Sequence, residues 1–98
     1  MDGYRKTNVP ANRTKVVIRV DKEVARYIQT GRRYYGFESE RAVGDQVEMT
    51  FLTPDVRDGF PRWFMMFGDC AVIVEPESLR ERVVELLEKT GANLKPGN

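Results

Sequence analysis

Residues 62–76, Arg-Trp-Phe-Met-Met-Phe-Gly-Asp-Cys-Ala-Val-Ile-Val-Glu-Pro, contain most of the signals that decide the fold of this chain. With the residue at position 60 they place four aromatic side chains at helical spacing: Phe60, Trp63, Phe64 and Phe67. Separations of three, four and seven residues put them on one face of a helix, so we expect them in the core. Gly68 then predicts the left-handed residue that ends this helix.

The second half of this stretch predicts a strand and the start of another helix. Residues 70–75 begin with a short apolar run, typical of a strand covered on at least one face, and we expect Val74 in the core. Pro76 suits the first position of a helix that runs to about Thr90 and stops at Gly91. The expected buried positions of that helix are Leu79, Val83, Leu86 and Leu87.

Upstream of this stretch, the pattern predicts three strands, a helix after the first of them, and the start of the aromatic helix. Residues 15–20 alternate as a strand, and a helix from 22 to about 30 follows, ended by Gly31. Strands at about 34–41 and 46–53 form a hairpin around Gly44. Asp58 is expected to cap the aromatic helix, which we place at residues 59–67.

The predicted order of elements, β-α-β-β-α-β-α over residues 15–91, is that of a ferredoxin-like fold with an extra C-terminal helix. We therefore predict an α+β domain whose antiparallel sheet carries two helices on one face. The expected outer positions of the sheet are Val17, Arg19, Glu48, Thr50, Ala71 and Ile73. The last two are apolar, so we expect the C-terminal helix or a partner to cover them. Residues 1–14 are interpreted as a linker or disordered arm, and residues 92–98 as a flexible tail.

Length and composition limit the class of protein. A chain of 98 residues with 41% hydrophobic residues is one domain with a modest core. It has no apolar run of membrane-spanning length and no secretory signal at its start, and its one cysteine rules out a disulfide framework, so we expect a cytoplasmic protein. Lys and Arg outnumber Asp and Glu by nine to three in residues 1–37, which is typical either of an anion-facing surface or of charges that folding mixes.

Catalysis is not predicted. The sequence has no histidine, which is the commonest general base and zinc ligand. Cys70 opens an apolar run and is better explained as a buried inert thiol than as a nucleophile. Glycine-rich phosphate loops are missing as well. We therefore expect no catalytic residue, no metal and no cofactor.

Candidate ligand contacts lie in two short segments. Arg32 and Arg33 precede two tyrosines, and Arg62 precedes Trp63. Guanidinium groups beside phenol rings can hold a phosphate and stack a base, so we predict ligand contacts at Arg32, Arg33, Tyr35 and Arg62. The alternative is that the first segment is a solvated helix end and that Trp63 belongs to the core. Base stacking on the sheet face is disfavoured because none of its central outer positions is aromatic.

Residues 15–90 resemble the C-terminal extension, or WCX, domain of WYL-domain transcriptional regulators. The features are a Trp-containing helix ending in Phe67-Gly68, the strand 70–76 and the Leu-Arg-Glu-Arg helix start at 79–82. The segments Val-Ile-Arg-Val-Asp at 17–21 and Val-Glu-Met-Thr-Phe at 47–51 also fit. The match lies in order and spacing rather than in one motif.

The resemblance implies a part of a bacterial, cytoplasmic, often dimeric regulator whose helix-turn-helix and WYL domains lie upstream. It implies a non-enzymatic role in sensing or oligomerisation, an anionic or nucleic-acid effector, and a homodimer as the working state. Because this chain has neither the helix-turn-helix nor the WYL triad, no DNA-reading residue is carried over. The alternative from another class is a stand-alone, dimeric, small-molecule-binding ferredoxin-like domain.

Overall fold

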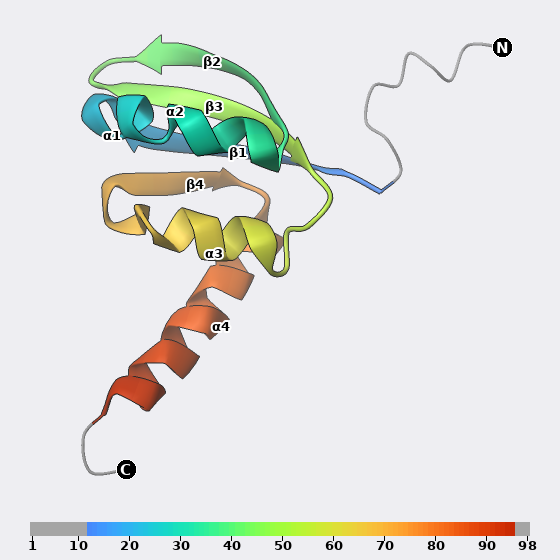
Figure 1. Ribbon diagram of the computed structural model, residues 1–98, viewed down its shortest axis with the longest axis vertical. Helices are drawn as coiled ribbons and strands as arrows, with labels where there is room; N and C mark the ends of the chain where they lie inside the picture. The colour runs from blue at the N-terminus through green and yellow to red at the C-terminus, as the bar shows by residue number, and fades with distance from the viewer. Residues whose placement is uncertain (1–11, 96–98) are drawn as a thin grey trace, which may run out of the picture.

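The computed structural model describes residues 12–95, and within them it contains a four-stranded antiparallel sheet with helices packed on one face (Figure 1). The strands lie in the spatial order β2-β3-β1-β4. Their bounds are Thr14–Asp21 for β1, Phe37–Val43 for β2, Gln46–Thr53 for β3 and Ala71–Glu75 for β4. The helices are α1 (Lys22–Tyr27), α2 (Gln29–Arg32), α3 (Gly59–Met65) and α4 (Glu77–Leu94), with 3-10 turns η2 (Arg33–Tyr35) and η3 (Gly68–Cys70). The domain is thus α+β.

The core lies between the sheet and the helices. Alternate residues of β1 and β3 point to this side, and the aromatic residues of α3 close it. The buried cluster comprises Val16, Ile18, Val20, Ala25, Ile28, Met49, Phe51, Phe60, Trp63, Phe64, Phe67, Ile73, Leu79 and Val83. The four aromatic residues around position 63 are therefore buried, and burying large aromatic side chains supplies much of the stability of a small domain.

The pairing of β4 differs from the sequence prediction. Ile73 lies opposite Ile18 and Ala71 lies opposite Val20, so both face the core rather than the outer side. Val74, which we predicted in the core, is instead 41% exposed, and Val72 is 55% exposed. The reason lies in the pairing with β1: Ile73 is opposite the buried Ile18, and since successive residues of a strand face opposite sides, Val72 and Val74 point outward. With Val72 and Val74 exposed, α4 does not cover this part of the outer face.

Two predicted helix stops are also corrected. Gly31 lies inside α2, and the helical run continues through η2 to Gly36, whose φ of 86° is left-handed. A Cβ at Gly36 would collide with the carbonyl of Leu52, so this stop requires glycine. Gly68 does not have a positive φ; its missing side chain makes room for the Phe64 ring, 3.1 Å from where a Cβ would lie.

The last helix is longer than predicted. Gly91 does not end α4, which continues to Leu94, because a glycine inside an exposed helix costs only about 1 kcal/mol. Pro76 is the residue that precedes the first turn rather than its first member. Residues 92–94 therefore belong to the helix and not to the predicted tail, while the rest of that tail beyond Lys95 and most of the predicted arm, residues 1–11, lie outside the described residues.

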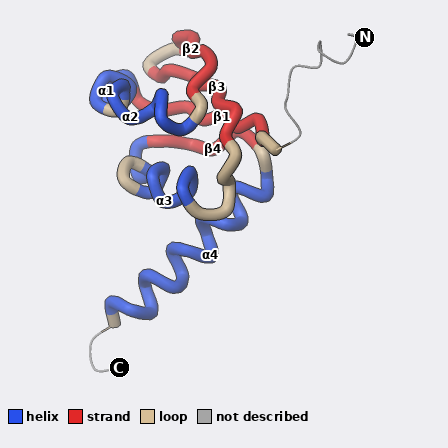
Figure 2. The backbone as a smooth tube through the Cα atoms, turned by 45° about the vertical axis from the view of Figure 1, so that its right-hand side comes forward, coloured by secondary structure: helices blue, strands red, loops and turns tan. Residues whose placement is uncertain are grey.

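The course of α4 sets it apart from the other helices. It packs against α3 and β4 near its start, and its last turns extend past α3 with no other described element beside them (Figures 1 and 2). Arg80 secures the start by donating a hydrogen bond of 2.8 Å from Nη2 to the carbonyl of Ile73 in β4. None of the helices described in residues 12–95 combines the length and the apolar character that crossing a membrane requires.

Candidate functional site

Arg32 is used within the fold. Its Nη1 lies 2.5 Å from Oε1 of Glu40 in β2, and its guanidinium carbon lies 3.8 Å from the centre of the Phe37 ring. Both contacts fasten the end of α2 to the neighbouring strand. We therefore leave Arg32 out of the candidate site, although the sequence predicted a ligand role for it.

Tyr35 links the core to the surface. Its ring stacks on Trp63 with centres 4.6 Å apart and an angle of 20° between the planes. The same ring meets the edge of Phe60 at 6.1 Å and that of Tyr34 at 5.1 Å. Because η2 ends at the left-handed Gly36, the predicted start of the second strand is wrong, and Tyr35 belongs to a turn that lies over α3.

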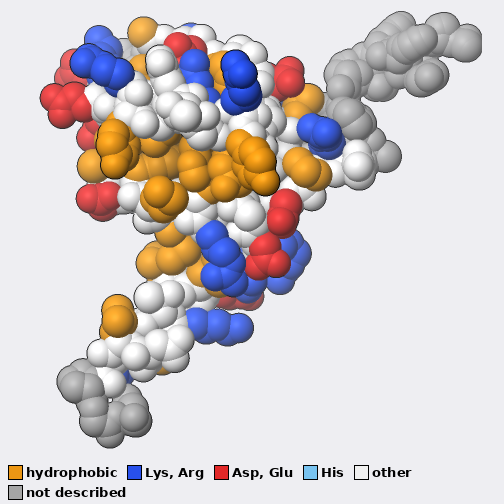
Figure 3. All heavy atoms as spheres, viewed as in Figure 1, with side chains coloured by type: hydrophobic (Ala, Val, Ile, Leu, Met, Phe, Trp, Pro, Cys, Tyr) orange, Lys and Arg blue, Asp and Glu red, His pale blue; other side chains and the backbone are white. Residues whose placement is uncertain are grey.

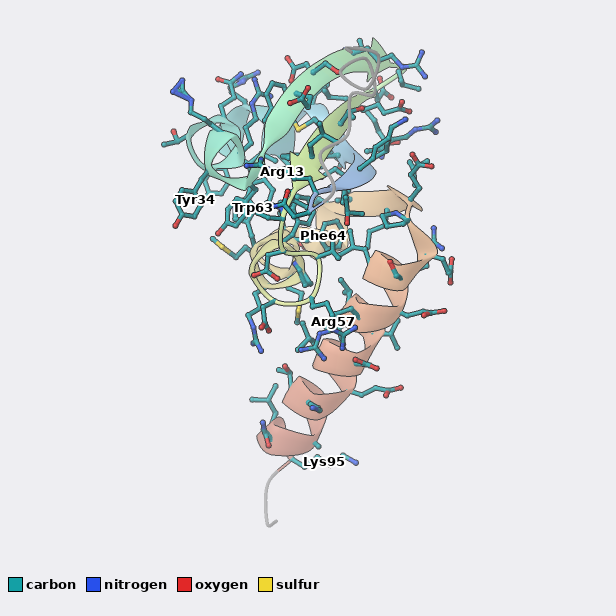
Figure 4. All side chains as sticks on the ribbon, turned by 90° about the vertical axis from the view of Figure 1, so that its right-hand side faces the viewer. Arg13, Tyr34, Arg57, Trp63, Phe64 and Lys95 are labelled. Atoms are coloured by element: carbon teal, nitrogen blue, oxygen red, sulfur yellow. The ribbon has the colours of Figure 1, made fainter. Side chains whose placement is uncertain are left out.

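Tyr34 is the exposed member of this aromatic group. Its side chain is 83% exposed, and it projects at the periphery while Trp63 and Phe64 lie inward (Figure 4). Arg33, just before it, is exposed and makes no ion pair with another described residue. In the space-filling view, apolar side chains gather in a band between the α1–α2 layer and α3 (Figure 3). We call Arg33, Tyr34 and Tyr35 the aromatic rim.

A surface cavity of about 350 Å³ lies beside the aromatic rim. Its walls come from η2 and from the loop between β3 and α3, and the lining residues are Tyr34, Tyr35, Thr53, Pro54, Asp55 and Gly59. The two walls are about twenty residues apart in the chain, so only the folded domain brings them together. One aromatic wall and one polar wall suit a planar ligand with polar edges.

Asp55 shapes the polar wall of this cavity. Its two carboxylate oxygens accept hydrogen bonds from the backbone N–H groups of Arg57, Asp58 and Gly59, at 3.3, 2.9 and 3.0 Å. These bonds, first that from Gly59 and then that from Asp58, lower the pKa of Asp55 below its ordinary value. The sequence predicted Asp58 as the cap; Asp58 does occupy the N-cap position of α3, but its side chain makes no capping bond, and Asp55 supplies the oxygens.

Arg62 is not grouped with the aromatic rim. Its Nε lies 3.5 Å from Oδ1 of Asp58, and the same carboxylate oxygen lies 3.5 Å from Nη2 of Arg82 in α4. Arg82 also donates a hydrogen bond of 2.6 Å to the carbonyl of Arg57. Arg62 is thus engaged on the side of α3 that faces α4, and the four residues predicted to bind a ligand do not form one site.

The outer face of the sheet is organised around one carboxylate. Glu48 of β3 accepts a hydrogen bond of 3.0 Å from Arg19 of β1 and lies 3.3 Å from Nη2 of Arg41 of β2. The hydrogen bond from Arg19 is the main cause of the lowered pKa of Glu48. Since the acid sits between the two bases, this face does not present a free cluster of positive charge.

Cys70 remains a poor candidate for chemistry. It ends η3 and is partly buried, rather than opening β4 as predicted. Burial, followed by the charge of Asp69, raises the pKa of its thiol, which therefore stays protonated at neutral pH.

Sequence reasoning missed Tyr34 and the cavity. Two consecutive residues in a 3-10 turn point about 120° apart, so only one of a Tyr-Tyr pair packs inward, and this signal was available at positions 34 and 35. The contribution of Asp55 was not visible, since it depends on how the loop before α3 folds back on its carboxylate.

The chain was compared with known proteins. The family model of the WCX domain matches residues 12–91, which include all four strands and most of α4. No curated protein and no solved structure matches the chain. A family match over this much of the chain establishes membership. The chain therefore belongs to the WCX domain family, the C-terminal extension of WYL-type transcriptional regulators.

Proposed function

We propose that this domain senses an anionic effector with a planar ring, such as a nucleotide or a single-stranded nucleic acid, on behalf of a larger cytoplasmic regulator. In such a regulator the DNA-reading residues lie in another domain. The family membership supports a regulatory role, and it favours this function over that of a stand-alone binding domain. The order of elements and the strand order β2-β3-β1-β4 support a ferredoxin-like arrangement for the domain.

The observation that carries this proposal is the 83% exposure of Tyr34 at the edge of the cavity. A large aromatic ring left in water costs free energy that a stacked ligand recovers. Tyr35 packs against the Tyr34 ring, and Trp63 in turn stacks on Tyr35, so Tyr34 is placed next to an anchored aromatic pair. Any nucleic-acid base can stack on such a ring, so this contact does not depend on sequence.

Arg33 supplies the charge that this proposal needs. It lies next to Tyr34 and is exposed, and no other described residue forms a hydrogen bond or an ion pair with its guanidinium group. A guanidinium group binds phosphate oxygens through paired hydrogen bonds. The carboxylate of Asp55 on the opposite wall is already occupied by three backbone N–H groups, which reduces its repulsion of an anion.

The test is a titration of the 98-residue chain with ATP and with a short single-stranded DNA oligonucleotide. The intrinsic fluorescence of Trp63, the only tryptophan, reports on binding through Tyr35. Measured at about 50 mM and about 200 mM salt, affinity should fall at the higher concentration because phosphate contacts release counterions. We expect Tyr34→Ala and Arg33→Ala to weaken binding.

Matched controls come from α1. Tyr27 is 81% exposed and Arg26 is exposed, but neither lines the cavity. We expect Tyr27→Ala and Arg26→Ala to bind like the wild type. Equal losses at both pairs of positions would indicate nonspecific attraction, and absence of binding at low salt would reject the proposal for this domain.

A further inference from the structure

A cleft in the surface lies where α3 ends and α4 passes beside it. Its volume is about 420 Å³. Small-molecule sites in proteins occupy roughly 300–1,000 Å³, so the cleft is large enough for a ligand. One wall comes from α3 and η3 and the other from α4, and the lining residues are Phe64, Met65, Gly68, Asp69, Val83 and Leu87. None of them lines the cavity beside the aromatic rim, so the two cavities are separate.

The walls of this cleft are mostly apolar. Phe64 and Val83 belong to the core, with 5% and 7% of their surface exposed, so the fold holds them in place. Leu87, which the sequence pattern predicted to be buried, is instead 53% exposed, because it lies at the edge of the stripe that α4 buries. Met65 is half-buried, and its unbranched side chain can adapt to different shapes. A ligand with an apolar body that covers Leu87 removes apolar surface from water, which favours binding.

Gly68 keeps part of the cleft open. Its φ is not positive, so its backbone conformation does not require glycine. A Cβ at this position would lie 3.1 Å from Cε2 of Phe64, and both residues line the cleft. A larger side chain would have to displace the Phe64 ring or occupy the cleft. The missing side chain therefore leaves room for a ligand between η3 and α4.

The charge at the cleft is negative. Asp69 is the one charged residue that lines it, and this carboxylate is exposed and forms no ion pair with another described residue. The pKa of the adjacent Cys70 thiol is raised by burial first and then by the charge of Asp69. Asp21 and Glu23 raise it further, so they lie at the same end of the domain. These acids outnumber the base between them in the chain, Lys22, and their combined field favours a cation.

We propose that this cleft binds a small organic cation with an apolar body, such as an arylalkyl amine. The body lies against Phe64, Val83 and Leu87, and the ammonium group lies at the mouth beside the carboxylate of Asp69. That carboxylate attracts a cation and repels an anion, so the cleft rejects the anionic effector proposed for the aromatic rim. The domain then carries two sites with opposite charge preference.

Three probes with the same apolar body and different charges test this proposal. At neutral pH phenylbutylamine is a cation, phenylbutanol is neutral and phenylbutyrate is an anion. Each is titrated into the isotope-labelled 98-residue chain while two-dimensional NMR follows the backbone amides. We expect shifts at Gly68, Asp69 and Leu87, with a dissociation constant of about 1 mM for the amine, because so small a ligand gains little free energy.

The order of the three affinities is the decisive result. The amine should bind about two- to fivefold more tightly than the alcohol, which is the effect of one exposed ion pair. The acid should bind more weakly than the alcohol, because its carboxylate meets that of Asp69. Equal affinities for the amine and the alcohol, or shifts confined to other residues, overturn the proposal.

Substitution of the carboxylate tests the recognition of charge. Asp69→Asn keeps the shape of the side chain and should bind the amine and the alcohol equally. Glu88→Gln removes an exposed carboxylate of α4 that does not line the cleft, and it should keep the preference for the amine. If Asp69→Asn also keeps this preference, Asp69 does not recognise the cation and the proposal is wrong.

Substitution of the exposed wall tests the recognition of the apolar body. Leu87→Ala should weaken the binding of all three probes by about threefold, since it removes apolar surface that the ligand covers. Leu94→Ala, at a 74% exposed position of α4 outside the cleft, should leave binding unchanged. Both variants should remain folded by circular dichroism because both positions are exposed. Equal behaviour of the two variants would place the ligand outside the cleft.

Two further measurements separate this site from the aromatic rim and from another occupant of the cleft. Tyr34→Ala should bind the amine like the wild type, so a loss of nucleotide binding in that variant does not affect the cleft. NMR spectra of the free chain over a roughly tenfold range of protein concentration show whether a second copy fills the cleft. We expect no change at Gly68 or Leu87. Shifts there that grow with concentration would mean that another chain occupies the cleft, and they would contradict the proposal.

Discussion

The buried aromatic cluster of α3 and the aromatic rim lie side by side, yet their aromatic residues have different surroundings. Trp63 and Phe60 are enclosed by the sheet and by one another, with ring centres 5.5 Å apart. Tyr34 touches only the edge of Tyr35 and faces water. Aromatic content alone therefore does not locate a site: an aromatic ring stabilises the fold when it is covered and is free for recognition when it is not.

Truncating the centre of the core should have the largest effect. We expect Trp63→Ala to lower the free energy of unfolding by about 3–5 kcal/mol, because it removes a side chain that contacts four other rings and leaves a cavity. That is a large share of the stability of a small domain. Urea unfolding followed by circular dichroism measures it. A loss below about 1 kcal/mol would show that Trp63 is not at the centre of the core.

The residue that joins the two regions should have an intermediate effect. We expect Tyr35→Ala to cost about 2 kcal/mol, since it removes a half-buried ring stacked on Trp63. Tyr35→Phe keeps the ring and should stay within about 0.5 kcal/mol of the wild type. Both are measured by urea unfolding with Trp63 fluorescence as the probe. If the two variants lose equal stability, the hydroxyl rather than the stacked ring is what matters.

The loop that forms the polar wall should contribute less, and in a pH-dependent way. We expect Asp55→Asn to lower stability by about 1 kcal/mol at pH 7, because the amide keeps one acceptor oxygen but loses the negative charge and the oxygen that accepts from Gly59. Because the folded state lowers the pKa of Asp55, the unfolded chain binds a proton there more readily. The stabilisation is therefore complete above the ordinary value of 3.8 and is lost as the pH falls through the lower value of the folded state.

Urea unfolding of Asp55→Asn at several pH values checks this prediction. The stability difference from the wild type should be constant near neutral pH and should shrink below about pH 4. Glu81→Gln serves as the control, because Glu81 is an exposed carboxylate to which no described residue donates a hydrogen bond. A difference that stays unchanged down to pH 2 would show that the backbone hydrogen bonds to Asp55 do not stabilise the loop.

The sequence predicted the core-facing side of β1 and β3 because their alternation follows burial, whereas the core-facing side of β4 was predicted wrongly. The alternation in residues 46–53 gave the bounds of β3, and the helical spacing of the α3 aromatics gave the core. Register and helix ends were less visible, since they depend on contacts between distant residues. Gly31 and Gly36 cannot be told apart in the sequence, but only at Gly36 would a side-chain Cβ collide with the carbonyl of Leu52.

The candidate site could be predicted only in part for the same reason. The Arg-Arg-Tyr-Tyr segment was predicted to contact a ligand, but the contacts that its four residues make in the folded domain differ. Glu40 and Phe37 engage Arg32, Trp63 engages Tyr35, and water surrounds Arg33 and Tyr34. Arg62, predicted as a ligand contact in a second segment, forms an ion pair with Asp58.

Removing the exposed ring of Tyr34 should have the smallest effect on stability. We expect Tyr34→Ala to change the free energy of unfolding by less than about 0.5 kcal/mol, since its ring is mostly in water. The same urea experiment measures this change, with Tyr27→Ala as the control. A loss near that of Tyr35→Ala would place Tyr34 within the core instead of on the rim.

The most direct test of recognition at the aromatic rim is the affinity of Tyr34→Ala for a short single-stranded DNA oligonucleotide at low salt, compared with that of Tyr27→Ala. Loss of one stacked base should weaken binding by about tenfold or more in Tyr34→Ala and leave Tyr27→Ala equal to the wild type. If Tyr34→Ala binds as tightly as the wild type, the aromatic rim is not the site of recognition.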